Sequence, residues 1–377
     1  MMKSAKGTVY FSKRNAAMAV CLVTAMAALS ACGSNEASND GNNAAASNAN
    51  AGTDAGNNAA ANAGTGTEGT TTNAGTDTAV KDPVKATLIL NWFAEPEHGG
   101  NFAALAKGFY KDAGFDMTLM PGGPSVSATQ LVASGKAEFG MANGDDILVA
   151  RQEGIPVVAI ATAFQKSPQA LFYHKDSGIS DFGDLNDHKV YVAATANFWQ
   201  YMKKKFSLDK AQEMKYTGQL VNFINDKNAV TQGYVTSETY TLQQEGIDFD
   251  VLLNADSGYN IYAGVYFTTE KMIKEHPDQV KAFVEATVKG WDYYKTNSDE
   301  INPAIQEKNP EMTLDMMKFS AEKEMDFAFG GDAATMGTGV MTTERWTEVQ
   351  QQLKDVGVLT KDEDIGKAFT TEFLPKK

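Results

Sequence analysis

The stretch VKATLILNWFAEPEHGGNFAALAKGFYKDAGFDMTLM, residues 84–120, carries the pattern on which the fold prediction depends. An apolar run over 84–92 predicts a strand, and apolar residues at helical spacing over 101–114 predict a helix. A second strand is expected at 115–120. The stretch therefore predicts one β-α-β unit, and the question is whether the chain repeats it.

The alternation continues to residue 164. A helix is expected over 125–135, beginning at Ser125 behind a proline, and a strand over 137–143. A helix over 145–154 then leads to an uninterrupted apolar strand at 155–164. Strands that are apolar throughout and alternate with helices are typical of a parallel sheet covered by helices.

A second α/β set follows a connection at 169–185. The C-terminal part then reads as helical, which predicts two lobes with a helical tail packed on the first lobe. The first lobe is expected to comprise residues 84–172 and 262–377, and the second lobe residues 173–261. Within the second lobe, strands are expected at 189–195, 213–219, 234–238 and 249–254, and helices at 197–206, 225–233 and 239–246.

The N-terminus has the organisation of an export leader. Basic residues precede an apolar segment over 16–29, and the sequence LSAC ends at Cys32. LSAC resembles the lipobox of bacterial lipoproteins, which implies a signal peptide over 1–31 and a lipid on Cys32; the alternative is a plain signal peptide that contains a cysteine. Residues 33–83 are almost all Gly, Ser, Asn, Ala, Thr and Asp, a composition that predicts a disordered tether, so that 32–83 joins the lipid to the folded part.

Charge and cysteine content exclude several functions. The chain has two cysteines, Cys21 in the leader and Cys32, so the folded part has no disulfide, thiolate metal site or cysteine nucleophile. The formal net charge is −14, and removal of the basic leader makes it more negative. An acidic protein is a poor partner for nucleic acid or for anionic lipid, so we expect membrane contact only through the lipid anchor, and a monomer.

The segment NWFAEPEHGG, residues 91–100, closes the first strand with mixed chemistry. Asn91 and Trp92 are candidates for ligand contact, although an aromatic residue at a strand end often belongs to the core. His98 is either a turn or cap residue or a hydrogen-bond partner of a ligand. Glu95 and Glu97 are expected only at the rim. The four histidines are scattered without the spacing of metal ligands, and no GxSxG sequence accompanies any of them, so no metal ligand or catalytic residue is predicted.

Other strand ends supply further candidates, because the carboxyl ends of parallel strands meet at one edge of a sheet. In PGGPS, Gly123 permits close approach of a ligand and Ser125 is expected to cap the next helix. For Asn143 and Asp145 a capping role is the alternative. The remaining candidates are Phe164 and Gln165 at the fourth strand end, Asn197, Trp199 and Tyr201 in an aromatic-rich helix start, and Glu238, expected at the end of a short strand.

The folded part resembles the solute-binding proteins of ABC importers, in the branch that binds thiamine-pyrimidine precursors and is related to nitrate-, taurine- and sulfonate-binding proteins. The motifs that carry the resemblance are LNWFAEPEHGG (90–100), AKGFYKDAGFDMTL (106–119), PGGPSVSATQLVASGKAEFGMA (121–142), ARQEGIPVVAIA (150–161) and FVEATVKGWDYY (283–294). The resemblance implies the type II periplasmic-binding-protein fold with two crossover strands. It also implies Trp92 as the ring on which a flat ligand stacks, and Glu238 as an acceptor for an aminopyrimidine edge.

The resemblance implies an extracytoplasmic protein, without a cofactor, that passes a heterocycle to an ABC permease and its ATPase. The candidate set has acids and aromatic residues but no Arg or Lys, which favours a neutral or cationic heterocycle over a sulfonate, taurine or nitrate. Riboflavin remains open, because it also needs stacking and polar edges. A fungal enzyme that makes the thiamine pyrimidine has the same fold, but its cysteine-rich run is absent from YNIYAGVYFTT (259–269). A sensory or scaffolding lipoprotein is the third alternative.

Overall fold

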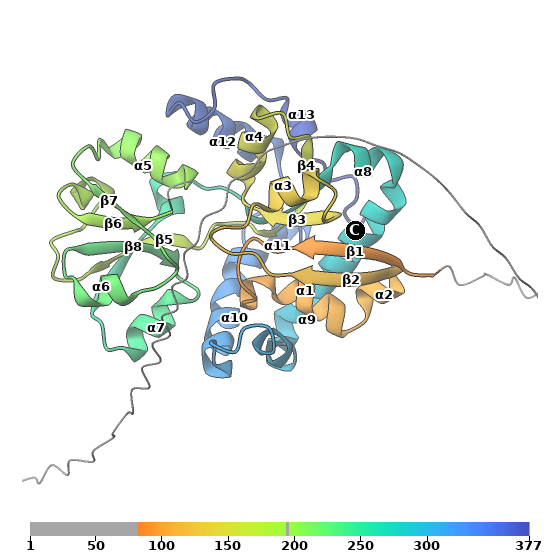
Figure 1. Cartoon of the computed structure of the whole chain (residues 1–377), viewed down its shortest axis with the longest axis horizontal. Coiled ribbons are helices and arrows are strands. Elements are labelled where there is room, and N and C mark those ends of the chain that lie inside the picture. The colour runs from red at the N-terminus through yellow and green to blue at the C-terminus, as the bar shows by residue number, and fades with distance from the viewer. Residues whose placement is uncertain (1–81, 194–195, 377) are drawn as a thin grey trace, which may run out of the picture. The chain divides into compact units, whose positions relative to one another are not determined.

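Two five-stranded sheets organise the chain, one in each lobe (Figure 1). The computed structural model describes residues 82–193 and 196–376, so the predictions for the signal peptide, for Cys32 and for nearly all of the tether lie outside the described residues. In sheet order, the first sheet contains β2 (Phe115–Met120), β1 (Val84–Ile89), β3 (Phe139–Ala142), β10 (Ala263–Thr269) and β4 (Val157–Phe164). The second contains β7 (Gln212–Lys215), β6 (Lys189–Val192), β8 (Ala229–Tyr234), β5 (Gln169–His174) and β9 (Phe249–Leu253).

Both sheets are mixed rather than parallel. β1 pairs in parallel with β2 and β3, but β10 runs antiparallel to β3 and β4. In the second sheet β5 runs antiparallel to β8 and β9. The expectation of a parallel first sheet was therefore wrong for β10, because the chain returns from the second lobe and inserts its strand in the opposite direction.

The chain crosses between the sheets twice, after β4 and after β9, which confirms the two-lobed α/β fold with two crossings. The predicted lobe boundary between residues 172 and 173 falls inside β5. All paired residues of β5 bond to strands of the second sheet, so the first crossing lies between Phe164 and Gln169. The prediction of a connection over 169–185 is therefore wrong for Gln169–His174, which form β5.

The second lobe also differs from the prediction around β8. Residues 225–233 were expected to be helical, but Ala229–Tyr234 form a buried central strand between β6 and β5. Glu238 consequently begins a helix instead of ending a strand. The helices of this lobe are η2 (Phe182–Leu185), α5 (Asn197–Phe206), α6 (Val221–Asn225), α7 (Glu238–Gln244) and η3 (Asn254–Ser257).

Short helices connect the strands of the first lobe. Ser127 caps the helix after β2 by accepting from the backbone of Gln130, so Ser125 is not the cap that was expected. The predicted helix at 101–114 is divided at Gly108, whose φ of +75° interrupts the helical backbone. These helices are η1 (Pro96–His98), α1 (Gly99–Ala106), α2 (Phe109–Asp112), α3 (Ala128–Ala133) and α4 (Gly144–Gln152).

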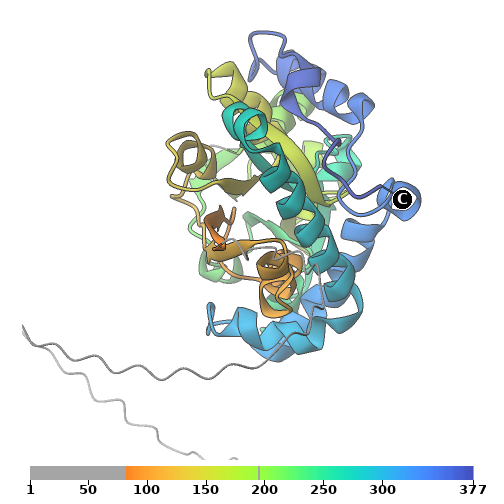
Figure 2. The same ribbon diagram turned by 90° about the vertical axis from the view of Figure 1, so that its right-hand side faces the viewer.

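The C-terminal helices pack on the first lobe, as predicted, and Figure 2 shows the teal and blue helices crossing in front of its strands. Two of them also reach the second lobe: the rings of Phe319 and Tyr240 lie 5.5 Å apart, and Gln352 Nε2 donates to the carbonyl of Gly258 over 2.8 Å. None of the helices described for residues 82–376 has the length and apolar character needed to cross a membrane. The C-terminal helices are α8 (Glu270–Glu275), α9 (Pro277–Gln306), α10 (Leu314–Phe329), α11 (Ala333–Met336), α12 (Thr343–Asp355) and α13 (Ile365–Ala368).

Close contact between α1 and α9 holds η1 in place below the site. A Cβ at Gly290 would overlap the carbonyl oxygen of Gly100 and lie 2.8 Å from the side chain of Ala104. We expect Gly290→Ala to lower the free energy of unfolding by about 1 to 3 kcal/mol through overpacking, which exceeds the gain of at most about 1 kcal/mol in helix propensity. Urea unfolding, with Glu285→Ala on the exposed face of α9 as control, measures this; an unchanged midpoint contradicts the close contact.

Candidate functional site

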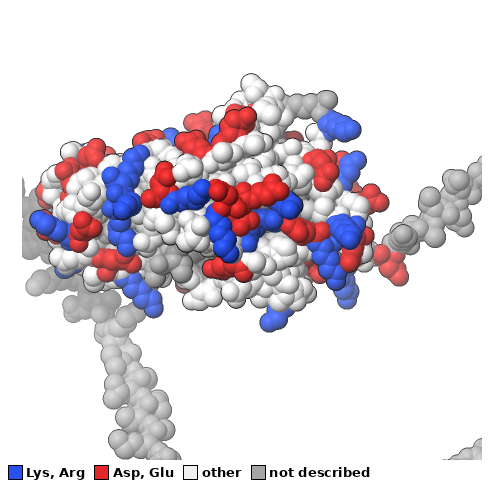
Figure 3. Space-filling model, turned by 90° about the horizontal axis from the view of Figure 1, so that it is seen from above, with Lys and Arg blue, Asp and Glu red and all other residues white. Residues whose placement is uncertain are grey.

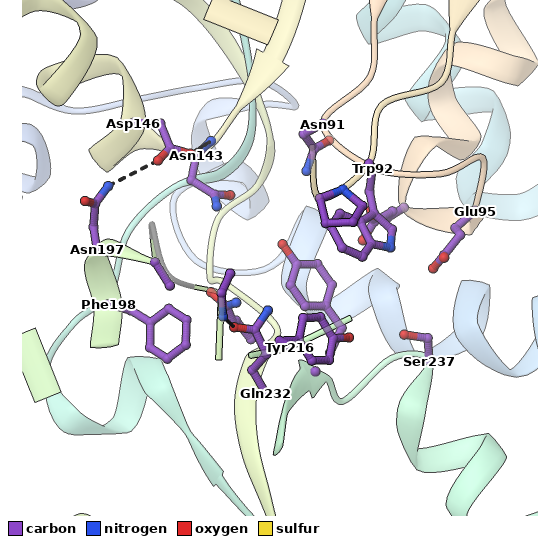
Figure 4. A pocket seen from close by; sticks show the side chains of 18 of the residues that line it. Asn91, Trp92, Glu95, Asn143, Asp146, Asn197, Phe198, Tyr216, Gln232 and Ser237 are labelled. Atoms are coloured by element: carbon purple, nitrogen blue, oxygen red, sulfur yellow. Dashed lines mark hydrogen bonds between the residues drawn. The ribbon is translucent and has the colours of Figure 1, made fainter. Parts of the chain in front are cut away.

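A cavity of about 240 Å³ lies between the two lobes and is lined from both (Figure 4). The first lobe contributes the segments that follow β1, β2 and β3, and the second lobe contributes the ends of β6, β7 and β8. Its lining residues are Asn91, Trp92, Glu95, Glu97, Gly123, Pro124, Val126, Asn143, Asp145, Asp146, Gln169, Ala193, Ala196, Asn197, Phe198, Tyr216, Gln232, Gly233, Tyr234, Ser237 and Glu238.

Trp92 forms an aromatic wall of this cavity. Its carbonyl accepts from the backbone of Gly122 over 2.8 Å, which fixes the main chain just after β1. Its ring meets that of Phe93 edge to face at 5.3 Å and is half-buried. The indole of Trp92 reaches the second lobe across the cleft. A Cβ added at Gly218 of that lobe would lie only 3.8 Å from the indole ring. A flat ligand entering beside it would find one large apolar face.

Four glutamates gather beside the Trp92 wall. Glu95 and Glu97 on η1 and Glu238 at the start of α7 line the cavity, and Glu324 of α10 lies behind them, 1% exposed. Burial raises the pKa of all four, and the charges of neighbouring glutamates raise the pKa of Glu95, Glu97 and Glu324 further. No Lys or Arg is among the described residues that line the cavity. The cavity therefore gathers carboxyl groups whose ionised forms are destabilised by burial and by one another, and no cation among the described lining residues compensates them.

Glu238 is held against the end of β8 by its own helix start. Its Oε2 accepts from the backbone of Tyr234 and from Ser237 Oγ, both over 2.7 Å. Gly233 makes room for it, because a Cβ there would lie 2.7 Å from the Glu238 carboxyl carbon. The Glu238 charge and burial both raise the pKa of Tyr216, which lines the cavity next to it. The protein thus fixes one oxygen of the Glu238 carboxylate at the edge of the cavity.

His98 supports the site from behind instead of lining the cavity. It is fully buried, and burial lowers its pKa to about 3, so the ring is neutral at ordinary pH. Its Nε2 donates to Asn91 Oδ1 over 3.0 Å. This bond turns the amide of Asn91 so that its Nδ2 is left for a ligand.

A second acidic pair joins the lobes at the start of α4. Asp145 accepts from the hydroxyl of Tyr259 over 2.8 Å, and Asp146 accepts from Asn197 Nδ2 of the second lobe over 3.1 Å (Figure 4). Burial and the neighbouring Asp145 raise the pKa of Asp146 to about 8. Because each bond connects the first lobe to α5 or to the second crossing, the pair helps to hold the lobes together.

The outer surface contrasts with the cavity. On the face shown in Figure 3, acidic and basic side chains are interspersed. Ion pairs among the described residues include Lys166 with Asp256 and Lys203 with Glu213. Within residues 82–193 and 196–376, no three His, Cys, Asp or Glu side chains are arranged as a group that could hold a metal ion. The acidic side chains that line the described part of the cleft are therefore not arranged as metal ligands.

Seven of the thirteen predicted ligand contacts line this cavity, and Ser125 lines a second cavity beside it. They belong to five different segments, which follow strands of the two sheets and meet at the cavity. The seven are Asn91, Trp92, Gly123, Asn143, Asp145, Asn197 and Glu238.

The other five predicted contacts do not reach the cavity. They are His98, Phe164, Gln165, Trp199 and Tyr201. Phe164 and Trp199 belong to the core. Phe164 packs edge to face on Trp291 at 5.7 Å, and Trp199 is fully buried with its Nε1 donating to Glu213. Gln165 Nε2 donates to the carbonyl of Val340 over 2.9 Å, and the ring of Tyr201 stacks on that of Tyr259 at 4.7 Å.

Several lining residues were not predicted. Glu95 and Glu97 were expected at the rim, but both line the cavity and Glu97 is only 7% exposed, because the turn of η1 points these side chains inward. In the aromatic helix start, Phe198 lines the cavity instead of Trp199. Tyr216 directly follows β7, so the strand-end argument would have found it. Tyr234 and Gln232 belong to β8, which was missed as a strand.

Comparisons with known proteins agree with this architecture. A family model described as NMT1/THI5 like matches residues 95–301. Riboflavin-binding protein RibY of Chloroflexus aurantiacus is 26% identical, over 81% of this chain and 92% of its own. A 4-amino-5-hydroxymethyl-2-methylpyrimidine phosphate synthase of Legionella pneumophila is 22% identical, over 77% and 92%. The solved structure of the periplasmic aliphatic sulphonate binding protein SsuA from Escherichia coli shares the fold, with a TM-score of 0.58, 11% identity, and 78% and 94% coverage.

Proposed function

This chain belongs to the NMT1/THI5-like family, and from that premise we propose that it is the substrate-binding protein of an ABC importer, which captures a thiamine-type pyrimidine precursor in the cleft between its lobes. The observation that carries the proposal is the set of uncompensated carboxylates beside an aromatic wall. Closure of two lobes around a ligand is a common way to bury it.

The carboxylates decide the chemistry of the ligand. Glu95, Glu97 and Glu238 offer acceptors in a site from which water is largely removed, so they favour a ligand that brings several N–H donors or a positive charge. An aminopyrimidine supplies an exocyclic amine and a ring nitrogen that accepts a proton. A sulfonate or nitrate would instead meet negative charge, since the described lining residues include no Lys or Arg.

The aromatic residues supply the apolar part of the interaction. Trp92 in the first lobe and Phe198, Tyr216 and Tyr234 in the second lie along the cavity wall. Stacking of a flat ring on an aromatic face contributes about 1 to 3 kcal/mol. Because both lobes contribute aromatic residues to the cavity, a ring that contacts all of them would hold the lobes together and couple binding to closure.

Riboflavin is the second candidate, and the relative RibY is named for binding it. Its isoalloxazine would use the same stacking wall. The polar edge of the flavin ring carries mostly hydrogen-bond acceptors, and so does the lining of the cavity, so the two do not complement each other. An aminopyrimidine brings hydrogen-bond donors and is therefore the better match.

We propose binding without catalysis. The Legionella relative is named for a reaction that yields a pyrimidine phosphate. A phosphate group needs donors and positive charge, and the described lining of this cavity has acids in their place. A sensory or scaffolding role with the same lobes remains the alternative, and the importer role predicts binding to a permease and its ATPase.

The cellular placement belongs to the same proposal. The leader and the LSAC sequence ending at Cys32 suit an extracytoplasmic protein whose lipid anchors it to the cell membrane. The tether then leaves the lobes free to approach the permease. Labelling with radioactive palmitate in cells, compared with Cys32→Ala, tests the anchor; equal labelling of both chains contradicts it.

Isothermal titration of the purified chain with 4-amino-5-hydroxymethyl-2-methylpyrimidine, riboflavin and taurine tests the ligand. We expect the aminopyrimidine to bind more tightly than riboflavin and taurine not to bind. Tight taurine binding without binding of either heterocycle contradicts the proposed function, and riboflavin binding alone selects the second candidate.

A further inference from the structure

A second cavity, of about 430 Å³, adjoins the cavity described above on the side of α3 and α4. The two share a wall, so they are neighbouring chambers of one cleft, and we call them the inner and the outer chamber. Both are lined by Asn91, Pro124, Val126, Asp146 and Asn197.

The outer chamber has a different lining from the inner one. Three hydroxyl side chains line it, those of Ser125, Ser127 and Thr129, together with the aliphatic side chains of Val149 and Ala150. The hydroxyls of Ser127 and Thr129 also bond to each other over 3.1 Å. Among its described lining residues there is no aromatic ring with which a second flat group would stack. A mixture of hydroxyls and aliphatic surface suits a chain that carries both hydroxyl groups and methylene groups.

The charge of the outer chamber excludes a phosphate on that chain. Glu153 and Asp146 are the titratable residues among its described lining, and both are acids, of which Asp146 is largely protonated at neutral pH because its pKa is about 8. Arg151, the cation nearest to Glu153 in the sequence, donates to the carbonyl of Val157 and pairs with Glu270 over 3.0 Å. A phosphorylated chain would therefore meet the carboxylate of Glu153 and no Lys or Arg among the described lining residues of either chamber.

The wall between the chambers is polar and joins the two lobes. The Asn197–Asp146 hydrogen bond of 3.1 Å lies in this wall, with Asn91 also lining both sides. A ligand that extends from the inner to the outer chamber passes these three side chains, each of which can bond to a hydroxyl near the ring.

We propose that the outer chamber is a second subsite, which binds an uncharged, hydroxyl-bearing aliphatic substituent on the ring held in the inner chamber, and that it rejects the phosphorylated form of that substituent. The inference rests on the proposed function, because it takes the inner chamber to hold the ring. It adds that the transported molecule is longer than a bare heterocycle and enters without phosphate.

The test compares ring compounds that differ only in the substituent, with the full chain and titration calorimetry. One series is lumiflavin, riboflavin and flavin mononucleotide; the other is an aminopyrimidine carrying a methyl group, a dihydroxypropyl chain, or that chain as its phosphate ester. In the series whose ring binds, we expect the hydroxylated chain to raise affinity at least about tenfold, as burial of about two methylene groups predicts. The phosphate ester should lose at least that factor.

Thr129→Trp fills the outer chamber and should reduce affinity for the hydroxylated member to that of the methyl member. Ser125→Trp, at an exposed loop position of the same chamber, repeats the test if Thr129→Trp does not fold. Ser134→Trp, exposed at the other end of α3, is the control and should change neither affinity.

The outcomes separate the subsite from the proposed function. Ring compounds that bind equally with and without the chain overturn the subsite and leave the proposed function standing. A phosphate ester that binds more tightly than the free chain, or a Thr129→Trp variant that weakens the methyl and hydroxylated members alike, also overturns the subsite. Binding of no ring compound in either series overturns both.

Discussion

Replacing Glu97 by Gln is expected to stabilise the ligand-free protein and at the same time to weaken ligand binding. Glu97 is 7% exposed, and burial together with Glu324 and Glu238 raises its pKa. Removal of the ionisable group removes this cost, so the free energy of unfolding of the ligand-free protein should rise at neutral pH. Loss of a charge-assisted hydrogen bond to the ligand should lower affinity about 10- to 100-fold.

The sign of the pH dependence follows from the same shift. Because the folded-state pKa of Glu97 lies above its ordinary value of 4.5, the folded protein holds a proton that the unfolded chain releases. Wild-type stability therefore falls, relative to Glu97→Gln, as pH rises above about 4.5. His98 has the opposite effect on stability: because its folded-state pKa is lowered to about 3, its contribution to the free energy of unfolding is lost as pH falls below 6.5. Both proteins contain His98, so this effect cancels in the comparison.

Urea unfolding between pH 4 and pH 8, with titration of the ligand at pH 7, measures both effects. Glu307→Gln is the control, because Glu307 is an exposed glutamate just after α9 and is not among the residues that line the cavity. A Glu97→Gln protein that is less stable than the wild type at pH 8, or that binds the ligand equally well, contradicts the role given to the glutamate cluster.

Replacing Trp92 by Ala is expected to lower ligand affinity about 10- to 100-fold. The reason is the loss of one stacking face, which contributes about 1 to 3 kcal/mol to the binding free energy. The stability of the ligand-free protein should change little, because Trp92 is half-buried at the cleft wall. Trp92→Phe should restore most of the affinity, since a smaller ring keeps the aromatic face.

Trp199→Ala is the matched comparison for Trp92→Ala. Trp199 is fully buried and its Nε1 donates to Glu213, so its removal should cost about 3 to 5 kcal/mol of stability without a direct loss of ligand contact. Thermal unfolding and titration of both variants distinguish the two roles. Equal loss of stability in both, with affinity unchanged in Trp92→Ala, contradicts the stacking wall.

Most of the fold could be predicted from the sequence, because the spacing of apolar residues indicates which faces of helices and strands are buried. The run at 155–164 became β4 and the helical spacing after residue 270 became α8 and α9. Local pattern failed where a strand contains polar residues: AVTQGY is β8, whose Thr231 and Gln232 are buried among neighbouring strands. Strand direction in β10 depends on the return of the chain from the other lobe, which no local pattern contains.

The site was only partly accessible for a related reason. Strand ends located Asn91, Trp92, Asn143 and Asp145, because sheet topology brings those ends together. Which residue of a helix start faces the cavity depends on the rotation of the helix, and Trp199 and Phe198 could not be distinguished by composition. The inward direction of Glu95 and Glu97 depends on the turn at η1, which packs against α1 and α10.

The central claim is that the cleft holds a donor-rich, flat heterocycle without phosphate or sulfonate. Native mass spectrometry of the full chain purified from its own cells, followed by release and mass analysis of any bound molecule, tests this claim most directly. The account predicts a nitrogen heterocycle that is present in the wild type and lost from the Trp92→Ala variant. A sulfonate, a nitrate or a phosphate ester released from the wild-type protein would contradict it.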